Sequence, residues 1–234
     1  MENKETNHLR YGGQVYDPYD APGLIIDLIP QGASVLDVGC GTGSISKLIS
    51  DIKSANVLGV EPNFERAEAA KKCGINVMHG EFSPSGFTSN HQFDVILFAD
   101  VLEHLTDPEE ALLLARRYLK PTGFIVASVP NVAHWTVRLN LIRGRFDYTD
   151  IGIMDRTHLR WFTKKTIRSL FSNAGLQIDR ESGSSGTWMP EYSRSILWKW
   201  INLEYRNKLI QLLAKKWPSL FACQYVVKAS FCRL

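Results

Sequence analysis

Three glycines follow a short apolar run in the segment VLDVGCGTG. Glycine is required where the backbone turns sharply and where a ligand must approach it without a Cβ in the way. Gly39, Gly41 and Gly43 form the pattern G-x-G-x-G. A dinucleotide fingerprint is G-x-G-x-x-G, and here Ser44 stands where its third glycine would be. Asp37 precedes the loop, and its charge would repel a diphosphate and attract a cation. The loop therefore predicts a site for a cofactor that carries positive charge.

A second acid, Glu61, ends the next predicted strand, twenty-two residues after Gly39. A carboxylate at this place can accept hydrogen bonds from both hydroxyls of a ribose. A ribose and a cationic group without a phosphate describe S-adenosylmethionine, so we predict this cofactor. An NAD-dependent oxidoreductase is the alternative on a similar pattern, and Asp37 and Ser44 disfavour it.

Histidines are the second group of residues that could do chemistry. Methyl transfer from a sulfonium is an in-line displacement, and a hydroxyl acceptor must also lose a proton to a group that titrates near neutrality. His134 and His158 lie in a long irregular segment, residues 130–162, and we predict that one of them is the base. His104, in the pair Glu103-His104, is interpreted as bonded to local backbone. Two adjacent ligands make a weak case for a metal, so no metal site is predicted.

The segment IMDRTHLRWFT places charged side chains among apolar and aromatic ones, next to His158. Guanidinium groups bind phosphates and carboxylates through paired N–H donors. We therefore predict that one wall of an acceptor site is formed by Arg145, Asp155 and Arg156. The alternative is that aspartates of this segment pair with the arginines and only brace the loop. The sequence alone leaves both interpretations open.

The elements that must position these residues alternate between strands and helices. Short β-branched runs followed by helix-like segments are typical of a parallel sheet covered by helices. Asn63, Thr163 and Asp107 are predicted N-caps, and Gly74 and Gly175 are predicted helix ends. The predicted strands are 34–38, 56–61, 75–79, 93–98, 124–129, 176–181 and 225–231, and the predicted helices include 44–52 and 108–119.

Composition limits the classes of function. Of 234 residues, 44% are hydrophobic and 22% are charged, so we predict a single domain, residues 1–234. A net charge of +3 without a run of lysines or arginines argues against a nucleic-acid partner. The four cysteines lie far apart and form no zinc-binding pattern. The polar N-terminus, and the lack of an apolar run of about 18 residues, predict a cytoplasmic protein.

The motifs together resemble the class I S-adenosylmethionine-dependent methyltransferases, from about Leu24 to Phe231. The resemblance is carried by LDVGCGTG, by GVEPN around Glu61, by FDVILFADVLEHL and by LKPTGFIVASVPN. The fourth-strand motif is similar to that of the small-molecule and quinone-biosynthetic branch. The resemblance implies an α/β fold with a Rossmann-like sheet of seven strands in the order 3-2-1-4-5-7-6, with strand 7 antiparallel and helices on its faces.

The resemblance also implies which residues contact the cofactor. They fall into three groups, which face the methionine part, the nucleoside side and the adenine ring. Asp37, Gly39, Asp100 and Val101 would face the methionine part. Gly41 would face the nucleoside side, and Glu61 would hold the ribose. Glu81 and Phe82 would flank the adenine ring, and Gly43 completes the glycine loop. The stretch RGRFDYTDIGIMDRTHLRWFT resembles one found among methyltransferases associated with sugars and glycolipids, which implies an acceptor site there.

Two further segments carry hypotheses about contacts. Residues 1–23 are predicted to be a lid over the cofactor or a tail. Residues 184–222 form an aromatic, helical insertion between the sixth and seventh strands. Within it, residues 192–222 place tryptophan and leucine on one side of a helix and lysines on the other. This pattern suits packing on the core or on a second copy of the chain in a homodimer, and it also suits peripheral contact with an anionic membrane.

We therefore predict a methyltransferase that uses S-adenosylmethionine to methylate an oxygen of a small molecule, a sugar or a lipid-linked metabolite. The alternative is a module of the same fold that binds the cofactor as a sensor or as a partner subunit, without turnover.

Overall fold

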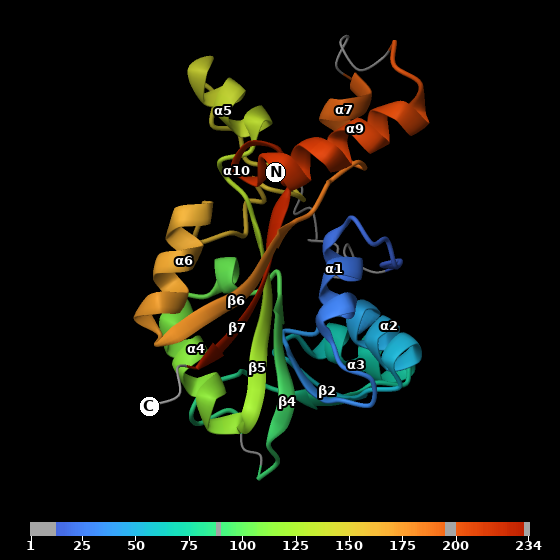
Figure 1. The fold of residues 1–234 in the computed structure, drawn as a ribbon. Helices are drawn as coiled ribbons and strands as arrows, with labels where there is room; N and C mark the ends of the chain where they lie inside the picture. The colour runs from blue at the N-terminus through green and yellow to red at the C-terminus, as the bar shows by residue number, and fades with distance from the viewer. Residues whose placement is uncertain (1–12, 88–89, 195–199, 232–234) are drawn as a thin grey trace, which may run out of the picture.

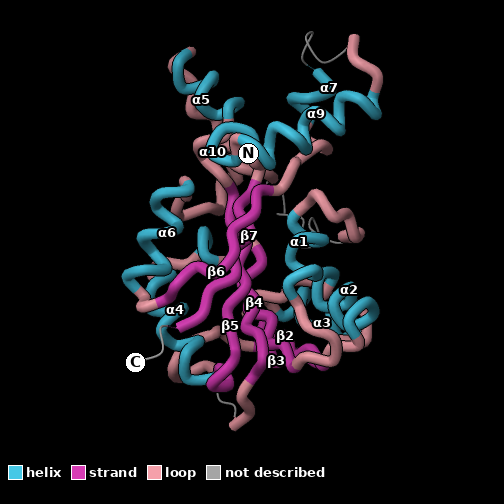
Figure 2. Tube along the Cα trace, viewed as in Figure 1, coloured by secondary structure: helices cyan, strands magenta, loops and turns pink. Residues whose placement is uncertain are grey.

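The computed structural model describes residues 13–87, 90–194 and 200–231. A seven-stranded sheet with the order β3-β2-β1-β4-β5-β7-β6 runs through this part of the chain (Figure 1, Figure 2). β7 is antiparallel to both of its neighbours, and the other pairs are parallel. The predicted order and the antiparallel last strand are confirmed. The strands are β1 (Ser34–Val38), β2 (Asn56–Glu61), β3 (Asn76–His79), β4 (Phe93–Ala99), β5 (Leu119–Pro130), β6 (Leu176–Gly183) and β7 (Gln224–Phe231).

β5 is the strand whose start differs most from the sequence prediction. It begins at Leu119, which pairs with Phe93, five residues before the predicted start at Phe124. The register then shifts before Phe124 pairs with Val95, so the polar residues between are a bulge rather than a loop. β6 is also longer than predicted, because its backbone pairs with β7 as far as Gly183.

Helices cover both faces of the sheet (Figure 1). One face carries α1 (Ala21–Leu28), α2 (Ser44–Lys53) and α3 (Phe64–Lys72), and the other carries α4 (Pro108–Ala115) and α6 (Lys164–Asn173). Alternate residues of a strand point to opposite faces. Accordingly, Leu97 belongs to the core under α1 and α2, whereas Phe98 packs in the core with Phe171 of α6.

The predicted helix starts are confirmed, but one predicted helix is too long. Asn63 accepts a hydrogen bond from the Arg66 amide at 3.0 Å, and Asp107 accepts one from the Glu110 amide at 2.9 Å. Thr163 forms a capping box with Thr166. α4 was predicted to reach residue 119 and ends at Ala115, followed by the 3-10 turn η2 (Arg116–Tyr118), because Leu119 is already part of the sheet.

Further helices of the described residues lie beyond the carboxyl ends of β4 and β5, at the top of Figure 1. The segment 130–162 was predicted to be irregular, and this was wrong for its first part, which forms α5 (Trp135–Ile142) because His134 provides an N-cap. The segment 184–222 contributes α7 (Pro190–Arg194), α9 (Leu203–Lys216) and α10 (Pro218–Phe221). Among the described residues, no helix has both the length and the apolar character that a transmembrane span requires.

Candidate active site

The glycine loop connects β1 to α2 at the carboxyl edge of the sheet. Gly39, Gly41 and Gly43 have φ values of +68°, +56° and +77°, which residues with a side chain rarely adopt. A Cβ on Gly39 would lie 2.8 Å from a methyl group of Val101, and a Cβ on Gly43 would lie 2.9 Å from that of Ala70. A Cβ on Gly41 would meet no described atom within 4 Å. Close packing therefore requires the first and third glycines, and the backbone at the second is open to a ligand.

Glu61 is held directly beside this loop. Its side chain is buried, and its two carboxylate oxygens accept hydrogen bonds from the amides of Gly41 at 2.9 Å and Asn63 at 3.0 Å. A carboxylate has about four lone-pair positions, so each oxygen can still accept a second hydrogen bond. The fold thus brings together the loop and the acid that the sequence predicted to hold the ribose.

Asp37 is a buried carboxylate with one unused oxygen. Oδ2 accepts a hydrogen bond from the Ser46 hydroxyl, whereas Oδ1 has no hydrogen-bond partner among the described residues. Burial raises the pKa of Asp37 to about 7, the charge of Glu61 adds to this rise, and the bond from Ser46 opposes it. A buried acceptor without a donor is costly, and a cationic N–H donor satisfies it. The site therefore fits the ammonium group of a methionine moiety.

Asp100 and Val101 lie at the end of β4, as predicted. Asp100 has a φ of +55°, and its carboxylate accepts hydrogen bonds from the Gln224 side chain at 2.7 Å and from the Ser128 hydroxyl at 2.8 Å. Burial raises the pKa of Asp100, and these two hydrogen bonds oppose the rise. The side chain joins the ends of β4, β5 and β7, and Val101 packs against Gly39. Contact of either residue with the cofactor stays a prediction.

Glu81 and Phe82, predicted to flank the adenine, follow β3. Glu81 is exposed. The Phe82 ring lies 5.5 Å from the Phe87 ring and 6.0 Å from the Phe98 ring, so it anchors the loop to the aromatic core. The arrangement fixes the position of the loop, and the predicted contact with adenine stays a prediction.

The described part of the N-terminal segment spans two sides of the site. The Gly13 amide donates to the Ser44 hydroxyl at 3.2 Å, at the start of α2. Further along, the Asp20 carboxylate accepts from the Ser185 hydroxyl and from the Gly186 amide, both at 2.9 Å. Residues 13–20 therefore connect the glycine loop to the segment after β6, and the predicted lid or tail stays a prediction. Residues 1–12 lie outside the described residues.

His134, one of the two predicted bases, has no exposed surface. Its Nδ1 lies 2.8 Å from the Thr136 hydroxyl, and its Nε2 lies 3.2 Å from the Tyr192 hydroxyl. Burial lowers the pKa of His134 to about 4. A ring with both nitrogens engaged and no exposed surface is suited to capping α5 and poorly suited to proton transfer from a substrate, so the geometry favours a structural role.

His158, the other predicted base, lies in a buried cluster with two residues that follow β4. The 3-10 turn η1 (Leu102–His104) brings Glu103 and His104 to it. His158 Nε2 lies 4.0 Å from Glu103 Oε1, and the rings of His104 and His158 meet edge to face at 4.9 Å. Neither carboxylate oxygen of Glu103 has a hydrogen-bond partner among the described residues. Burial raises the pKa of Glu103 well above its usual range, and the charge of Asp100 adds to the rise.

Backbone carbonyls set the tautomers of both histidines. His104 Nδ1 lies 3.1 Å from the Thr157 carbonyl, and His158 Nδ1 lies 3.2 Å from the Ile153 carbonyl. A carbonyl only accepts, so each neutral ring carries its proton on Nδ1 and has an acceptor lone pair on Nε2. One ligand atom from each of Glu103, His104 and His158 lies within 4.8 Å of the other two. Such a set can accept a proton or hold a divalent cation.

The sequence did not predict that His158 joins Glu103 and His104. Sequence reasoning interpreted His104 as bonded to local backbone and predicted no metal, because the pair Glu103-His104 offered only two adjacent ligands. His104 does bond a backbone carbonyl, but that carbonyl belongs to Thr157, 53 residues away. The backbone amides of Leu159 and Arg160 also donate to the Glu103 carbonyl, which fixes the long segment 130–162 on the end of β4.

The predicted acceptor wall mostly braces its own loop. Asp155 is buried, and one of its oxygens accepts from the Thr157 amide at 2.8 Å and from the Thr157 hydroxyl at 2.7 Å. Arg156 pairs with Asp150 at 2.6 Å on an exposed surface. Arg145 is exposed. The alternative of a braced loop is thus supported for Asp155 and Arg156, and their contact with an acceptor stays a prediction.

Comparison with known proteins agrees with this geometry. Residues 16–181, more than half of the chain, match the family model described as a methyltransferase domain. A ubiquinone biosynthesis O-methyltransferase from Actinobacillus pleuropneumoniae is 32% identical over 110 residues, which are 43% of this chain and 47% of that protein. The matched region thus spans about half the length of this curated relative.

Solved structures share the fold. A Thermotoga maritima protein described as a S-adenosylmethionine-dependent methyltransferase, possibly acting on histamine, has a TM-score of 0.61 and 18% identity, over 89% of this chain and 86% of its own. The magnesium protoporphyrin IX methyltransferase of Synechocystis, solved with the demethylated cofactor bound, has a TM-score of 0.57 and 15% identity, over 90% and 79%. At such identities the likeness shows the fold alone, and the acceptor must be argued from the site. The family match and the cofactor loop together show that the chain belongs to the class I S-adenosylmethionine-dependent methyltransferases.

Proposed function

We propose that this protein methylates a hydroxyl oxygen of a small molecule or of a lipid-linked metabolite. The observation that carries the proposal is the cluster of Glu103, His104 and His158, which places a proton acceptor beside the end of β4. That strand end also carries Val101, which packs on the glycine loop at Gly39. A hydroxyl acceptor needs a nearby base, because the neutral oxygen is a weak nucleophile. The likeness to a protein named for ubiquinone O-methylation supports the same class of acceptor.

The chain's own residues divide the work. S-adenosylmethionine supplies, when bound, a methyl group on a positively charged sulfur. Asp37 holds the ammonium group through its unused oxygen, and Glu61 holds the ribose hydroxyls. Both carboxylates are fixed by backbone or hydroxyl donors before any ligand arrives, so little ordering is left for the binding step.

His104 is the group that receives the acceptor's proton in this proposal. It is the partly exposed member of the cluster, and its Nε2 lone pair is available because Nδ1 donates to the Thr157 carbonyl. The O–H bond of the acceptor breaks toward Nε2 as its oxygen acquires the methyl group. His158 packs edge to face against the His104 ring at 4.9 Å, and its Nε2 lies 4.0 Å from Glu103 Oε1, so it holds the ring in position. His158, predicted as the base, is thereby proposed as a positioning residue.

The test is transfer of labelled methyl from the cofactor to a panel of catechols, phenols and hydroxylated lipids. His104→Gln should lower kcat about 100-fold or more, while the affinity for S-adenosylhomocysteine stays unchanged. His91→Gln, in a polar loop, is the matched control. Full activity of His104→Gln would overturn the assignment. Cofactor binding without transfer to any hydroxyl would favour the alternative, a module that binds the cofactor without turnover.

We propose that the insertion supplies a membrane contact for a lipid-linked acceptor. α9 buries Ile210 and Ala214, whereas Leu203 and Leu212 are 60% and 58% exposed and Trp217 is 50% exposed. The same helix also carries Lys208, Lys215 and Lys216, as do segments that lie on anionic membranes. Flotation with vesicles of phosphatidylglycerol tests this, and Leu212→Glu should reduce the bound fraction. A dimer in analytical ultracentrifugation, lost in the same variant, would instead assign the surface to a second copy. Ile196, part of the predicted apolar face, lies outside the described residues.

A further inference from the structure

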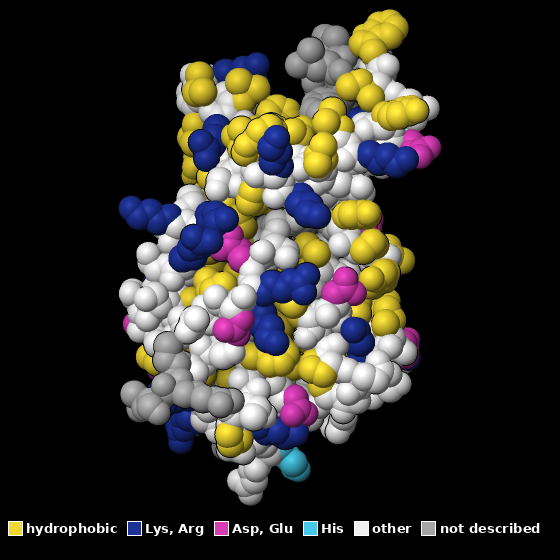
Figure 3. Space-filling model, in the orientation of Figure 1, with side chains coloured by type: hydrophobic (Ala, Val, Ile, Leu, Met, Phe, Trp, Pro, Cys, Tyr) yellow, Lys and Arg dark blue, Asp and Glu magenta, His cyan; other side chains and the backbone are white. Residues whose placement is uncertain are grey.

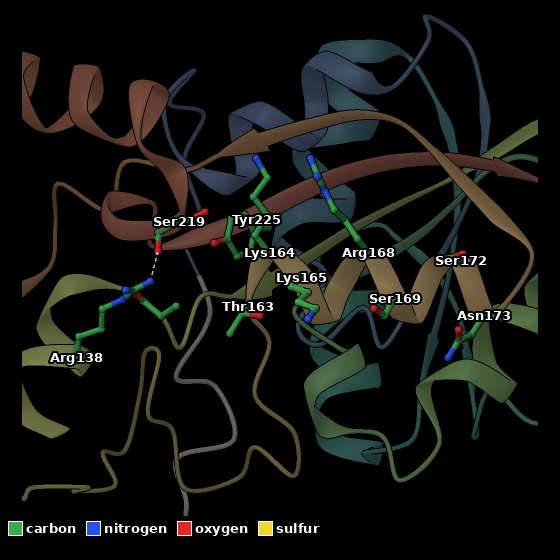
Figure 4. Close-up of a pocket in the computed structure, with 11 residues that line it drawn as sticks. Arg138, Thr163, Lys164, Lys165, Arg168, Ser169, Ser172, Asn173, Ser219 and Tyr225 are labelled. Atoms are coloured by element: carbon green, nitrogen blue, oxygen red, sulfur yellow. Dashed lines mark hydrogen bonds between the residues drawn. The ribbon is translucent and has the colours of Figure 1, made fainter.

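A cavity of about 760 Å³ lies on the α6 side of the sheet, away from the glycine loop (Figure 4). One wall is the polar face of α6. Side chains spaced three and four residues apart share one face of a helix, and the apolar face of α6 is turned inward by Ile167 and Phe171. The opposite wall is formed by α5 and α10. The α6 residues that line the cavity are Lys164, Lys165, Arg168, Ser169, Ser172 and Asn173.

Positive charge dominates the lining. Arg138, Lys164, Lys165 and Arg168 all contribute to it, and no acidic residue does. Glu181, which lies outside the lining, pairs with Lys164 at 2.9 Å and with Arg168 at 2.8 Å. Lys165 and Arg138 form no ion pair with any residue in the described part of the chain. Figure 3 shows basic side chains gathered on this face, near the first turn of α6.

Arg138 is held in place without losing its charge. Its guanidinium donates to the Ala133 carbonyl at 2.5 Å and to the Ser219 carbonyl at 3.3 Å (Figure 4). A guanidinium has five N–H donors, so three remain for another ligand. Because both contacts are with neutral carbonyls, the side chain is positioned between α5 and α10 with its charge uncompensated.

A buried hydroxyl points to a missing acceptor. Tyr225 lines the cavity with 0% exposure, and its hydroxyl forms no hydrogen bond within 3.5 Å to any described residue. The Ser219 side chain and the Lys164 backbone lie near it and oppose the rise in the pKa of Tyr225 that burial causes. The first turn of α6 lines the same space, where the helix dipole favours negative charge. An unpaired O–H donor beside uncompensated cations fits an oxyanion.

A second hollow of about 630 Å³ continues from this cavity. The two share Arg138, Lys164 and Ser219 in their lining, and the second adds Lys216 and the ring of Trp217. Lys216 Nζ lies 4.7 Å from the Trp217 ring centroid. A ligand that reached from one hollow to the other would place its anionic group among the cations of α6 and an apolar part against Trp217.

We propose that this cavity binds a phosphoryl group attached to an apolar or planar body, at a site separate from the methyl donor. Guanidinium, ammonium and hydroxyl donors around one space match the three acceptor oxygens of a phosphate monoester. The phosphoryl group belongs either to a soluble phosphorylated metabolite or to a phospholipid headgroup. The cavity lining contains none of Glu103, His104 and His158, so phosphoryl binding there is independent of the proposed acceptor chemistry.

The test begins with calorimetric titration of the full chain with inorganic phosphate and with phenyl phosphate. Saturable binding is expected, tighter for phenyl phosphate. Lys165→Gln should weaken it about tenfold, and Tyr225→Phe, which keeps the ring, about threefold. Lys72→Gln on α3, across the sheet, is the matched control and should change nothing. Circular dichroism melts check that each variant folds.

Vesicle flotation separates the two sources. Binding to vesicles that contain phosphatidic acid, whose headgroup is a phosphate monoester, assigns the site to a headgroup if Lys165→Gln weakens it and phenyl phosphate displaces it. Phenyl phosphate binding without vesicle binding assigns it to a soluble metabolite. The proposal is overturned if phosphate and phenyl phosphate show no saturable binding, or if Lys72→Gln weakens them as much as Lys165→Gln does.

Discussion

Asp37 gives the sharpest prediction, because its ionisation must be linked to cofactor binding. Burial raises its pKa to about 7 in the free protein. A cationic ammonium beside Oδ1 favours the charged form, so binding lowers this pKa and releases a proton below neutrality. If only the ionised carboxylate binds, the apparent affinity falls about tenfold between about pH 8 and about pH 6.

The assay is calorimetric titration with S-adenosylhomocysteine across this pH range, in buffers of different ionisation enthalpy. Wild type should release close to one proton per site near pH 6 and fewer above neutrality. Asp37→Asn should bind more weakly at alkaline pH and show no such dependence, which also controls for titration of the ligand itself. A wild-type affinity that stays flat across the range, or proton release that persists in Asp37→Asn, refutes the reasoning.

The same shift has a consequence for stability. Between the ordinary pKa of 3.8 and about 7, the folded protein holds a proton on Asp37 that the unfolded chain has released. The free energy of unfolding therefore falls as pH rises through this window, by up to about 4 kcal/mol for this group. Urea denaturation of wild type and Asp37→Asn at both ends of the window should show the fall in wild type and remove this contribution in the variant.

Three further predictions follow from the same geometry. Gly43→Ala should lower the free energy of unfolding by about 2–4 kcal/mol, because the added Cβ meets Ala70. Gly41→Ala should lower it by about 1 kcal/mol and chiefly weaken S-adenosylhomocysteine binding. Urea melts and calorimetry that rank the two variants the other way contradict this. His134→Ala should lower the free energy of unfolding by about 2–4 kcal/mol at neutral pH and by less near pH 4. The buried ring stays neutral while the ring in the unfolded chain gains a proton, so wild type loses stability as pH falls from 6.5 to about 4. Equal losses at both pH values would argue against this. Chelators should leave methyl transfer unchanged if His104 accepts the proton. The cluster would instead be assigned to a metal if chelators abolish activity and Zn²⁺ restores it in wild type but not in Glu103→Gln.

Local chemistry explains why most of the fold was predictable. A run such as SVLDV, buried on both faces of a parallel sheet, is mostly apolar, with Asp37 as the functional exception, so its bounds can be read directly. Asn63, Asp107 and Thr163 each act on the amide three residues away, and their predicted caps were confirmed. β5 was predicted less well, because the pairing of Leu119 with Phe93 depends on a bulge that the polar residues after Leu119 do not announce.

The sequence by itself determined the family and the cofactor loop, because the glycines, Asp37 and Glu61 interact within one strand-turn-helix unit and the next strand end. Only the tertiary structure decided which histidine has an available nitrogen. His134 is closed off by Tyr192, 58 residues away, and His104 is oriented by Thr157, 53 residues away. The basic cavity likewise combines α5, α6, α10 and β7. Such contacts depend on how the sheet brings distant segments to one edge, and no spacing along the chain encodes that distance.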